Sequence, residues 1–557
     1  MKTNKIVVLG AISAFLFSGC QDLDLHYQGG TLDEEQVTAA VEAIPDRVNS
    51  SISGMYAILN KPYVYFGLTN VTYGRADDFG YPCAALGQDL NSGDMVSIVS
   101  DYNWFKVALE WSDRNPTYAN PQIRLGLFYK VIYAANDALA AIPEGEIQND
   151  ALRAKRGQAR AIRAWAYLSL APYFQFKYVG NEDKPCVPIV TGAAGEDTRN
   201  NPRASVKDVY ELIMTDINGA IDDLKGFTRE NKGIIDRNVA FGLRARANLN
   251  MEQWEAAAND ADSAMVGYTP YTKNEIETGT PGFYNASDHN WIWALLLPQE
   301  LIGDELASWP SQLGSFSGNA YVPYAGIYRS INKILWDLIP ETDVRKGWWL
   351  DADLHSPYLE GLVWKDPDTG TEYKGQDIAT ASIPDVKEPF NAYANVKFGQ
   401  RAGIGSAYND GDWCMMRAEE MIFIKAEGLA KSGKLDEGKA LLEDFVKTNR
   451  DPNYTCTATD VDAFSDAVWF QRRVELWGEG FAMSDVMRLG KPVVRVVEGK
   501  ESNYPEVYQF NIAPDDPWML LRFVQRETSN NAGLVNNEGG TAPKQGDGKD
   551  LRDGVTD

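Results

Sequence analysis

The chain has 557 residues, long enough for a large core or several domains, and its 44% hydrophobic and 24% charged residues are typical of a soluble globular protein. Its 53 Lys and Arg residues are outnumbered by 78 Asp and Glu residues, giving a net charge of −25. A surface this acidic repels phosphate backbones, which argues against a nucleic acid partner. The three histidines are far apart and lack metal-ligand spacing, which argues against a catalytic zinc.

The first residues have the pattern of a bacterial export signal. An apolar run, Ile6–Phe17, follows two lysines and is too short to span a bilayer as a helix. It ends at Phe17-Ser18-Gly19-Cys20, which resembles a lipobox, although Phe17 replaces the usual Leu. We therefore expect residues 1–19 to be a lipoprotein signal peptide, Cys20 to carry lipid, and residues 20–31 to form a tether. The alternative is an ordinary secreted protein with a free cysteine near its cleavage site.

Amphipathic helical patterns dominate the chain that follows, with apolar residues recurring at intervals of three and four. Two of the expected pairs are joined by short turns and resemble tetratricopeptide hairpins, but their spacing is uneven. The sequence therefore predicts an all-α dominated fold, an interrupted tetratricopeptide-like scaffold of helical hairpins with long loop-rich insertions that carry the ligand face. The expected helices are Ile44–Leu59, Pro121–Ile142, Ala151–Tyr178, Ser205–Leu224, Asn238–Asn250, Gln253–Met265, Asp412–Lys431, Leu435–Arg450 and Asp462–Leu489, with Gly478–Gly480 as a candidate break.

Two long stretches lack the helical pattern. Tyr63–Asn120 is rich in Gly, Asn, Asp and aromatic residues, and Thr269–Arg401 is similar, with a strand-like run at Trp291–Leu297. Irregular segments of this length are usually either functional or wrongly assigned as irregular. The Gly- and Asp-rich residues 533–557 are expected to form a flexible tail.

Four helical segments, in this order, resemble motifs of the SusD/RagB family of Bacteroidetes outer-membrane lipoproteins. The resemblance covers nearly the whole mature chain, although the spacer before Val187-Pro188 is longer than usual and the Pro-rich C-terminal signature is weak. The segments are Leu127–Ala141 with its Ala135-Asn136 pair, Arg160-Ala161-Ile162-Arg163-Ala164-Trp165-Ala166-Tyr167, Arg417-Ala418-Glu419-Glu420 to Ala426-Glu427-Gly428-Leu429, and Arg472-Arg473-Val474-Glu475-Leu476 to Arg488.

The resemblance implies a helical N-terminal region at 32–268 and a C-terminal region at 269–532, the latter holding the loop-rich insertion 269–401. It also implies an outer-membrane, lipid-anchored protein facing the cell surface, which binds a nutrient polysaccharide or oligosaccharide and delivers it to a TonB-dependent transporter. No catalysis and no cofactor are expected. A peptide-binding member of the family, a glycoside hydrolase and a pure protein scaffold are the alternatives.

The charged motif residues have a structural interpretation. They lie on amphipathic helices, where ion pairs that are partly buried are costly to break. We therefore expect them to hold the scaffold together and not to bind ligand: Arg160, Arg163, Glu420, Arg473 and Glu475.

Aromatic residues in the two irregular stretches are the best candidates for a binding site. Sugar rings present apolar C–H faces and polar rims, so a site for them needs aromatic platforms beside hydrogen-bonding side chains. For each loop aromatic, packing in the core is the competing interpretation. The candidate ligand-binding residues are Arg75, Asp77, Asp78, Tyr81, Trp104, Trp309, Tyr321 and Tyr324. The tryptophans on helical stripes are instead expected in the core: Trp165, Trp254, Trp336, Trp469 and Trp477.

Other chemistry has weaker support in the sequence. No GxSxG, P-loop or GxGxxG motif is present. Asp366–Glu372 alternates oxygen-bearing side chains as calcium loops do, but an Asp-Gly turn explains it as well, and no metal site is predicted. Cys83, Cys186, Cys414 and Cys456 form no CxxC pair, which leaves one or two long-range disulfides open.

Overall fold

The computed structural model describes residues 34–60, 75–143, 145–192, 198–301, 306–318, 320–367, 369–380 and 389–557. Helices dominate these residues, and the strands among them form three antiparallel pairs. The predicted helix-dominated fold is confirmed. The signal segment, Cys20 and the tether lie outside the described residues.

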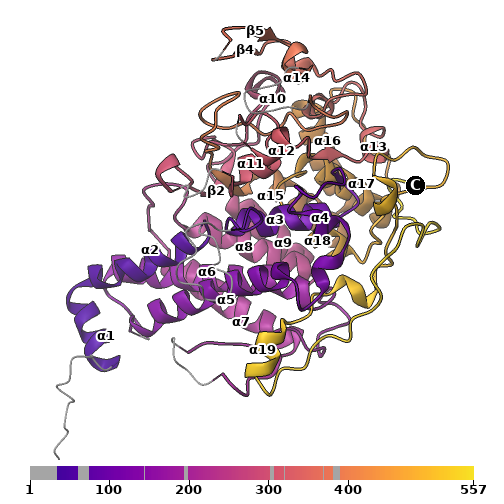
Figure 1. Cartoon of the computed structure of the whole chain (residues 1–557). Coiled ribbons are helices and arrows are strands. Elements are labelled where there is room, and N and C mark those ends of the chain that lie inside the picture. The colour runs from indigo at the N-terminus through magenta and orange to yellow at the C-terminus, as the bar shows by residue number, and fades with distance from the viewer. Residues whose placement is uncertain are drawn as a thin grey trace, which may run out of the picture.

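The scaffold is a stack of long helices in which neighbours along the chain lie side by side (Figure 1). From α2 onward each helix of the series packs on the next, and the later hairpin joins the stack where α15 packs on α9. Short polar caps start several of them; Ser205, the expected N-cap, forms a complete capping box with Asp208. The series is α1 (Glu34–Ala43), α2 (Asn49–Ile58), α5 (Ala119–Ala140), α6 (Asp150–Phe174), α7 (Val206–Asp223), α8 (Arg237–Asn250), α9 (Trp254–Ala264), α15 (Ala418–Lys431) and α16 (Leu435–Asn449).

The core sits between this stack and the irregular segments. The ring of Trp165 on α6 meets Phe128 on α5 at 5.7 Å and Trp293 at 5.8 Å, and all three are buried. Trp165 is therefore a core residue, as its position on a helical stripe predicts.

The last long helix is broken where the sequence indicates. α17 (Val461–Glu475) and α18 (Ala482–Leu489) are separated by Gly478 and Gly480, which have φ of +80° and +87°. Residues with a side chain rarely adopt these angles. A Cβ at Gly478 would also lie 2.4 Å from the ring of Phe398.

Two parts of the secondary structure differ from the expectation. Trp413–Arg417, predicted as the start of a helix, is strand β6, which pairs antiparallel with β2 (Trp291–Leu295). Every residue of both strands is buried, so neither shows the alternation that identifies a strand with one exposed face. Tyr81–Asn91, predicted as irregular, is helix α3, whose Ala84, Leu86 and Leu90 are buried despite the polar, Gly-containing sequence.

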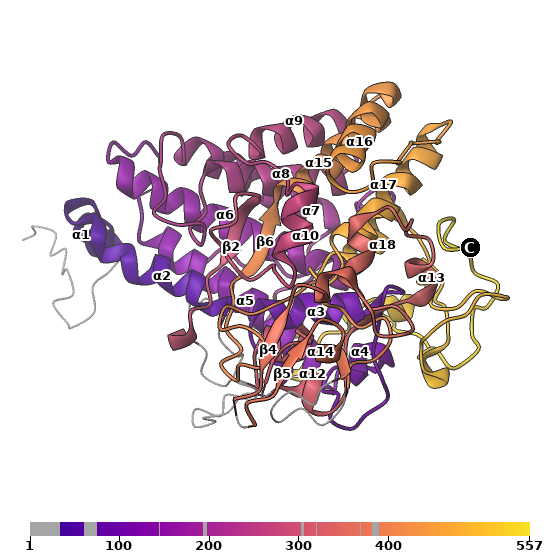
Figure 2. The same cartoon turned by 90° about the horizontal axis from the view of Figure 1, so that it is seen from above.

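The two irregular stretches meet through a short pair of strands. β1 (Met95–Val96) of the first stretch pairs with β3 (Ser330–Ile331) of the second, with Met95 opposite Ile331. The short elements of the two irregular stretches include α4 (Lys106–Leu109), α10 (Lys273–Gly279), α11 (Trp309–Leu313), α12 (Tyr321–Tyr324), α13 (Lys333–Trp336), η5 (Val344–Trp348), η6 (Pro357–Leu359), β4 (Val363–Lys365), β5 (Glu372–Lys374) and α14 (Asp377–Thr380). Figure 2 shows α8 and α9 of the stack on one side of the molecule and β4, β5, α12 and α14 of the insertion on the other.

A buried cluster of charges joins the insertion to the C-terminal helices. Glu475, fully buried at the end of α17, accepts hydrogen bonds from Arg345 at 3.1 Å, Arg417 at 2.8 Å and Arg450 at 2.7 Å. Burial alone would raise the pKa of this carboxyl, but the guanidinium groups of Arg450 and Arg417 hold it well below its ordinary value. We call these four residues the Glu475 cluster.

The other charged motif residues also form ion pairs, as predicted. Arg163 pairs with Asp216 at 2.7 Å, and Glu420 pairs with Arg246 at 2.6 Å. Arg160 pairs with Asp223 at 2.8 Å. Since these contacts join neighbouring helices, their role is to hold the stack together.

Arg473 contacts the C-terminal tail. Its guanidinium lies 2.6 Å from Asp94 and 2.9 Å from Asp553, whose carboxylate also accepts a hydrogen bond from Thr556. Asp553 and Thr556 are both 2% exposed. These contacts do not fit the expectation of a flexible tail, because they fix its last residues against α17. A high glycine and aspartate content predicts an exposed tail, but it cannot predict an ion pair with a residue as distant along the chain as Arg473.

The four cysteines in the described residues do not form disulfides. Cys83, Cys186, Cys414 and Cys456 are free and buried, so the question that the sequence left open is resolved in favour of unpaired thiols.

Glu475→Gln should lower the free energy of unfolding by about 3–5 kcal/mol, because three buried guanidinium groups lose their shared counter-charge. A depressed carboxyl pKa stabilises the fold above the unfolded value, 4.5, and that contribution is lost as the pH falls through the folded pKa. The free energy of unfolding of the parent should therefore fall below about pH 4.5, and that of the variant should fall less. Thermal and urea unfolding at pH 7 and at pH 4 measure both effects.

The matched control is Asp262→Asn, which removes an ion pair with Lys425 at 2.6 Å in which the Asp262 side chain is 61% exposed. Exposed pairs contribute about 1 kcal/mol or less. If the two variants are equally stable, the Glu475 cluster does not hold the fold together.

Candidate functional site

Arg75 is the first described residue of the irregular stretch Tyr63–Asn120. Its Nε donates to Asp77 at 2.8 Å, and the Asp77 carboxylate also accepts a hydrogen bond from Asn120 at 3.2 Å. Asp77 is 1% exposed, whereas the Arg75 side chain is 38% exposed. The buried carboxylate therefore fixes a guanidinium whose outer face remains open to solvent.

The guanidinium of Arg75 is close to two aromatic rings. Its carbon lies 5.3 Å from the centre of the Trp104 ring, and the Trp104 and Tyr321 rings meet edge to face at 6.4 Å. Trp104 and Tyr321 are half-buried and come from different irregular stretches. We call Arg75, Trp104 and Tyr321 the aromatic patch. The structure thus brings together three of the residues that the sequence singled out.

A buried arginine fixes the loop that carries Trp104. Arg329 donates to Asn103 at 3.1 Å, to Ser97 at 2.9 Å and to the backbone of Gln312 at 2.9 Å. Burial lowers the pKa of this guanidinium to about 9. The Asn103 side chain in turn accepts from the Phe105 backbone N–H, on the other side of Trp104. Arg329 carried no signal in the sequence that set it apart from other arginines.

The aromatic patch has the chemistry of a binding surface. It offers ring faces for C–H contacts and guanidinium N–H groups for hydroxyl oxygens. Its carboxylate, on Asp77, is buried and already accepts hydrogen bonds from Arg75 and Asn120. This arrangement positions the cation and does not present a free acid or base.

Two of the predicted site residues lie in the interior. Trp309 is 2% exposed; its Nε1 donates to the Gly411 carbonyl at 2.7 Å, and its ring packs against Trp413 at 5.7 Å. Asp78 is 2% exposed. Neither side chain is available as a platform on the surface, so neither belongs to the aromatic patch. A tryptophan in a Gly-rich segment looks the same in sequence whether long-range contacts bury it or not.

Tyr81 and Tyr324 do not extend the aromatic patch. Tyr81 begins α3 and packs against Trp165 at 5.0 Å, beside Arg246 and Glu420, in a cavity of about 90 Å³. Burial raises the pKa of its hydroxyl. The side chain of Tyr324 lies outside the described part of the structure.

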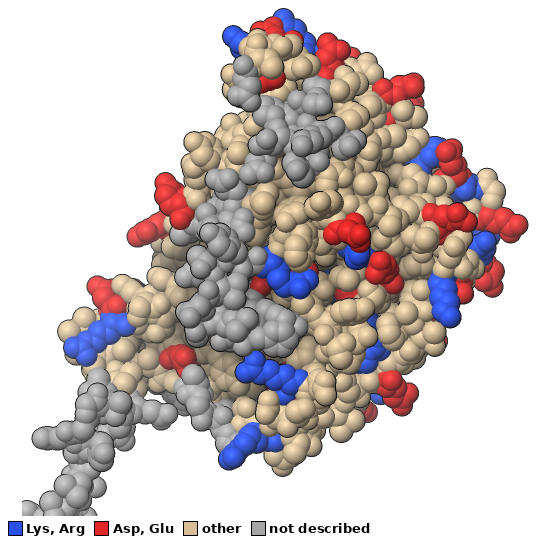
Figure 3. Space-filling model, in the orientation of Figure 1, with Lys and Arg blue, Asp and Glu red and all other residues tan. Residues whose placement is uncertain are grey.

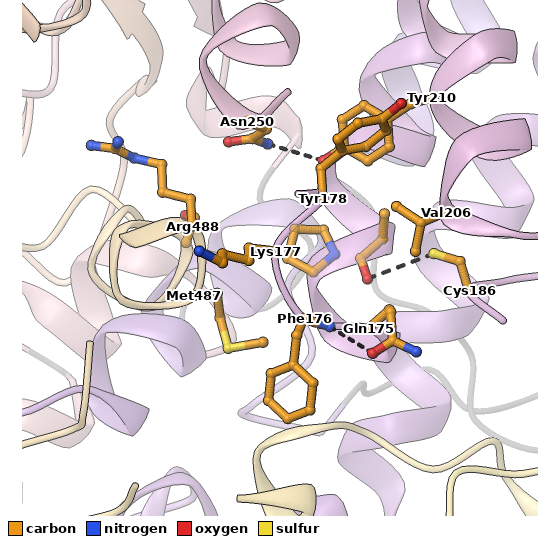
Figure 4. Close-up of a pocket in the computed structure, with 13 residues that line it drawn as sticks. Gln175, Phe176, Lys177, Tyr178, Cys186, Val206, Tyr210, Asn250, Met487 and Arg488 are labelled. Atoms are coloured by element: carbon orange, nitrogen blue, oxygen red, sulfur yellow. Dashed lines mark hydrogen bonds between the residues drawn. The ribbon is translucent and has the colours of Figure 1, made fainter. Parts of the chain in front are cut away.

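A smaller pocket lies in the helical stack where α6 ends, and the sequence analysis did not anticipate it. Figure 4 shows Tyr178 beside Tyr210, whose rings are 5.0 Å apart, and Asn250, which donates to the Tyr210 hydroxyl at 3.1 Å. Arg488 approaches from α18 on the opposite side. The volume is about 20 Å³, enough for about one water molecule and too little for a sugar.

The surface and the acidic loops add little further chemistry. On the face drawn in Figure 3, acidic and basic side chains are scattered among uncharged residues. Asp366 uses its carboxylate within its own turn, accepting from the Thr369 backbone at 3.2 Å and from its hydroxyl at 2.6 Å. Within the described residues, no group of three or more His, Cys, Asp or Glu could hold a metal ion, and no helix is long and apolar enough to cross a membrane.

Comparison with known proteins identifies the family. Residues 86–225 match a family model described as "Starch-binding associating with outer membrane", and residues 360–539 match the model of the SusD family. The chain belongs to the SusD/RagB family. Residues 86–225 contain the end of α3 and all of α5–α7, and residues 360–539 contain α15–α18. Together they include the motif segments found in the sequence.

Relatives of known structure share the SusD fold over nearly their whole length. A SusD-like carbohydrate binding protein from Bacteroides vulgatus superimposes with a TM-score of 0.68 at 22% identity, covering 89% of this chain and 98% of that one. A SusD superfamily protein from Bacteroides thetaiotaomicron gives a TM-score of 0.66 at 19% identity, covering 88% and 99%. SusD-like protein P38 of Formosa agariphila is 21% identical over 387 residues, 66% of this chain and 72% of that protein.

Trp309 is buried and Trp104 is half-buried, so truncating them should cost the SusD fold different amounts of stability. Trp309→Ala should destabilise the protein by about 3–5 kcal/mol, because it leaves a large cavity in the core. Trp104→Ala should lower the stability by only about 1 kcal/mol, since it removes the ring's contacts with Arg75 and Tyr321 and leaves no large cavity. Melting temperatures of the two variants test this difference. Equal losses of stability would show that Trp104 is a core residue too.

Proposed function

We propose that this protein is a cell-surface lipoprotein that binds a nutrient glycan and delivers it to a TonB-dependent outer-membrane transporter. Membership of the SusD/RagB family supports this proposal, as does the description of the Bacteroides vulgatus relative as a carbohydrate binding protein. The expected acylation of Cys20 would provide the anchor, because several acyl chains bind a membrane stably where a single chain does not.

The observation that carries the proposal is the aromatic patch. Trp104 and Tyr321 keep part of their rings exposed while Arg75 lies over one of them. A pyranose ring stacks on such a surface with its C–H face, and its hydroxyls accept hydrogen bonds from the guanidinium. A neutral sugar also suits a protein of net charge −25, which would repel an acidic polymer.

The position of the patch fits delivery to a partner. It is built from the two irregular stretches, whereas the helical hairpins bury their apolar stripes against one another. A rigid helical scaffold with binding residues on its loops is a common arrangement for recognition. The polar outer faces of the hairpins remain available for contact with another protein.

Binding to neutral polysaccharides tests the proposal. In native gels cast with soluble starch, xylan, galactomannan or laminarin, at least one polymer should retard the purified protein, and the protein should release no reducing sugar from it. Trp104→Ala should weaken that retention about tenfold, equivalent to about 1.4 kcal/mol, because it removes the main stacking platform.

Trp254→Ala is the matched control. Trp254 is also half-buried and also carries a cation over its ring, Lys431 at 4.6 Å, but it lies on a helical hairpin. It should bind as the parent does. Retention on none of the polymers, or sugar release, would contradict the proposed function; a bound peptide found by mass spectrometry in the purified protein would favour a peptide ligand.

A further inference from the structure

A larger pocket than the two described above opens in the insertion, where α10, α13 and η5 meet. Its volume is about 700 Å³, against about 90 Å³ for the cavity beside Tyr81. Binding sites for small organic ligands occupy about 300–1,000 Å³. Neither the family motifs nor the candidate residues of the sequence analysis drew attention to this pocket.

Three aromatic side chains contribute to its lining. Trp349 and Tyr358 are 1% and 7% exposed, and the Tyr358 hydroxyl is fixed by a hydrogen bond to the Val344 carbonyl. Trp336 is half-buried, although its position on a helical stripe predicted a core residue. The lining therefore combines two buried aromatic side chains with a tryptophan that is partly open.

A lysine is held over the ring of Trp336. The ammonium of Lys346 lies 4.2 Å from the centre of the Trp336 ring and donates to the Ile339 carbonyl at 2.9 Å and to Glu341 at 2.6 Å. The Lys346 side chain is 12% exposed. This repeats the combination of the aromatic patch, where Arg75 lies over Trp104, in a concave setting.

The rim mixes donors and acceptors. Lys273 and His355 can donate, Glu277 and Asp351 can accept, and Thr342 can do both. The carboxylates around the pocket are not outnumbered by cations, so nothing selects a phosphate or a sulfate. A neutral ligand rich in hydroxyl groups uses both kinds of partner.

The pocket is anchored to the scaffold. Asp343, which lines it, is 4% exposed and pairs at 2.6 Å with Arg345, a member of the Glu475 cluster. Asp343 therefore cannot shift without disturbing buried ion pairs. Such a site is largely formed before its ligand arrives, which reduces the ordering cost of binding.

We propose that this pocket is a second site for a neutral oligosaccharide, separate from the aromatic patch, with which it shares no residue. The inference rests on the proposed function and adds a second point of attachment for the same class of ligand. Two sites on one rigid body would hold a long glycan more tightly than either site does alone.

Calorimetric titration with a six-sugar fragment of the retained polysaccharide tests the pocket. The parent should bind two fragments per chain. Thr342→Trp, which places a bulky ring at the exposed rim, should reduce this to one. Thr278→Trp adds the same ring to an exposed position on α10 outside the pocket and should leave two.

Fluorine NMR with 5-fluorotryptophan provides an independent readout. The Trp336 signal, assigned through Trp336→Phe, should shift on adding the fragment, and it should shift equally in Trp104→Ala. One fragment per parent chain with an unmoved Trp336 signal would overturn the second site and leave the proposed function intact. Retention on none of the four polysaccharides would overturn both.

Discussion

The buried carboxylate of Glu475 is the contact on which the arrangement of the molecule depends. Three guanidinium groups from three distant segments, Arg345, Arg417 and Arg450, converge on it where the side chain has no access to water. Removing Glu475 takes the shared counter-charge from three guanidinium groups in a medium of low polarity. The insertion, the start of α15 and the end of α16 must therefore dock on α17 together. If only apolar contacts joined these segments, a shift of about an ångström between them would cost less stability, because apolar burial is not directional.

The irregular segments gain their shape from this anchoring. With the insertion fixed through Arg345, the pairing of Met95 with Ile331 brings the first irregular stretch to the second. Arg329 then holds the loop that presents Trp104 beside Tyr321. The aromatic patch and the large pocket are thus both products of long-range contacts, one on an outer surface and one in a concavity. In each of them a cation lies over a tryptophan ring.

The sequence predicts the scaffold far better than the site. Helices such as α5 and α7 follow from apolar spacing, which is a local property of the chain. β6 was missed because a short, fully buried apolar run has no period that separates strand from helix. Trp104 and Trp309 both lie in Gly-containing, non-periodic segments, yet one is half-buried and the other is in the core. Their burial is decided by partners far away along the chain, which no local pattern reports.

Hydrogen–deuterium exchange, with and without an oligosaccharide cut from the retained polysaccharide, tests most directly whether glycan binds on the irregular segments. Ligand contact with Trp104 and Tyr321 should slow amide exchange in residues 97–105 and 320–324, since binding restricts the openings that exchange requires. Exchange in α8, α9, α15 and α16 should not change. Slower exchange confined to those helical hairpins, with residues 97–105 and 320–324 unaffected, would contradict the account.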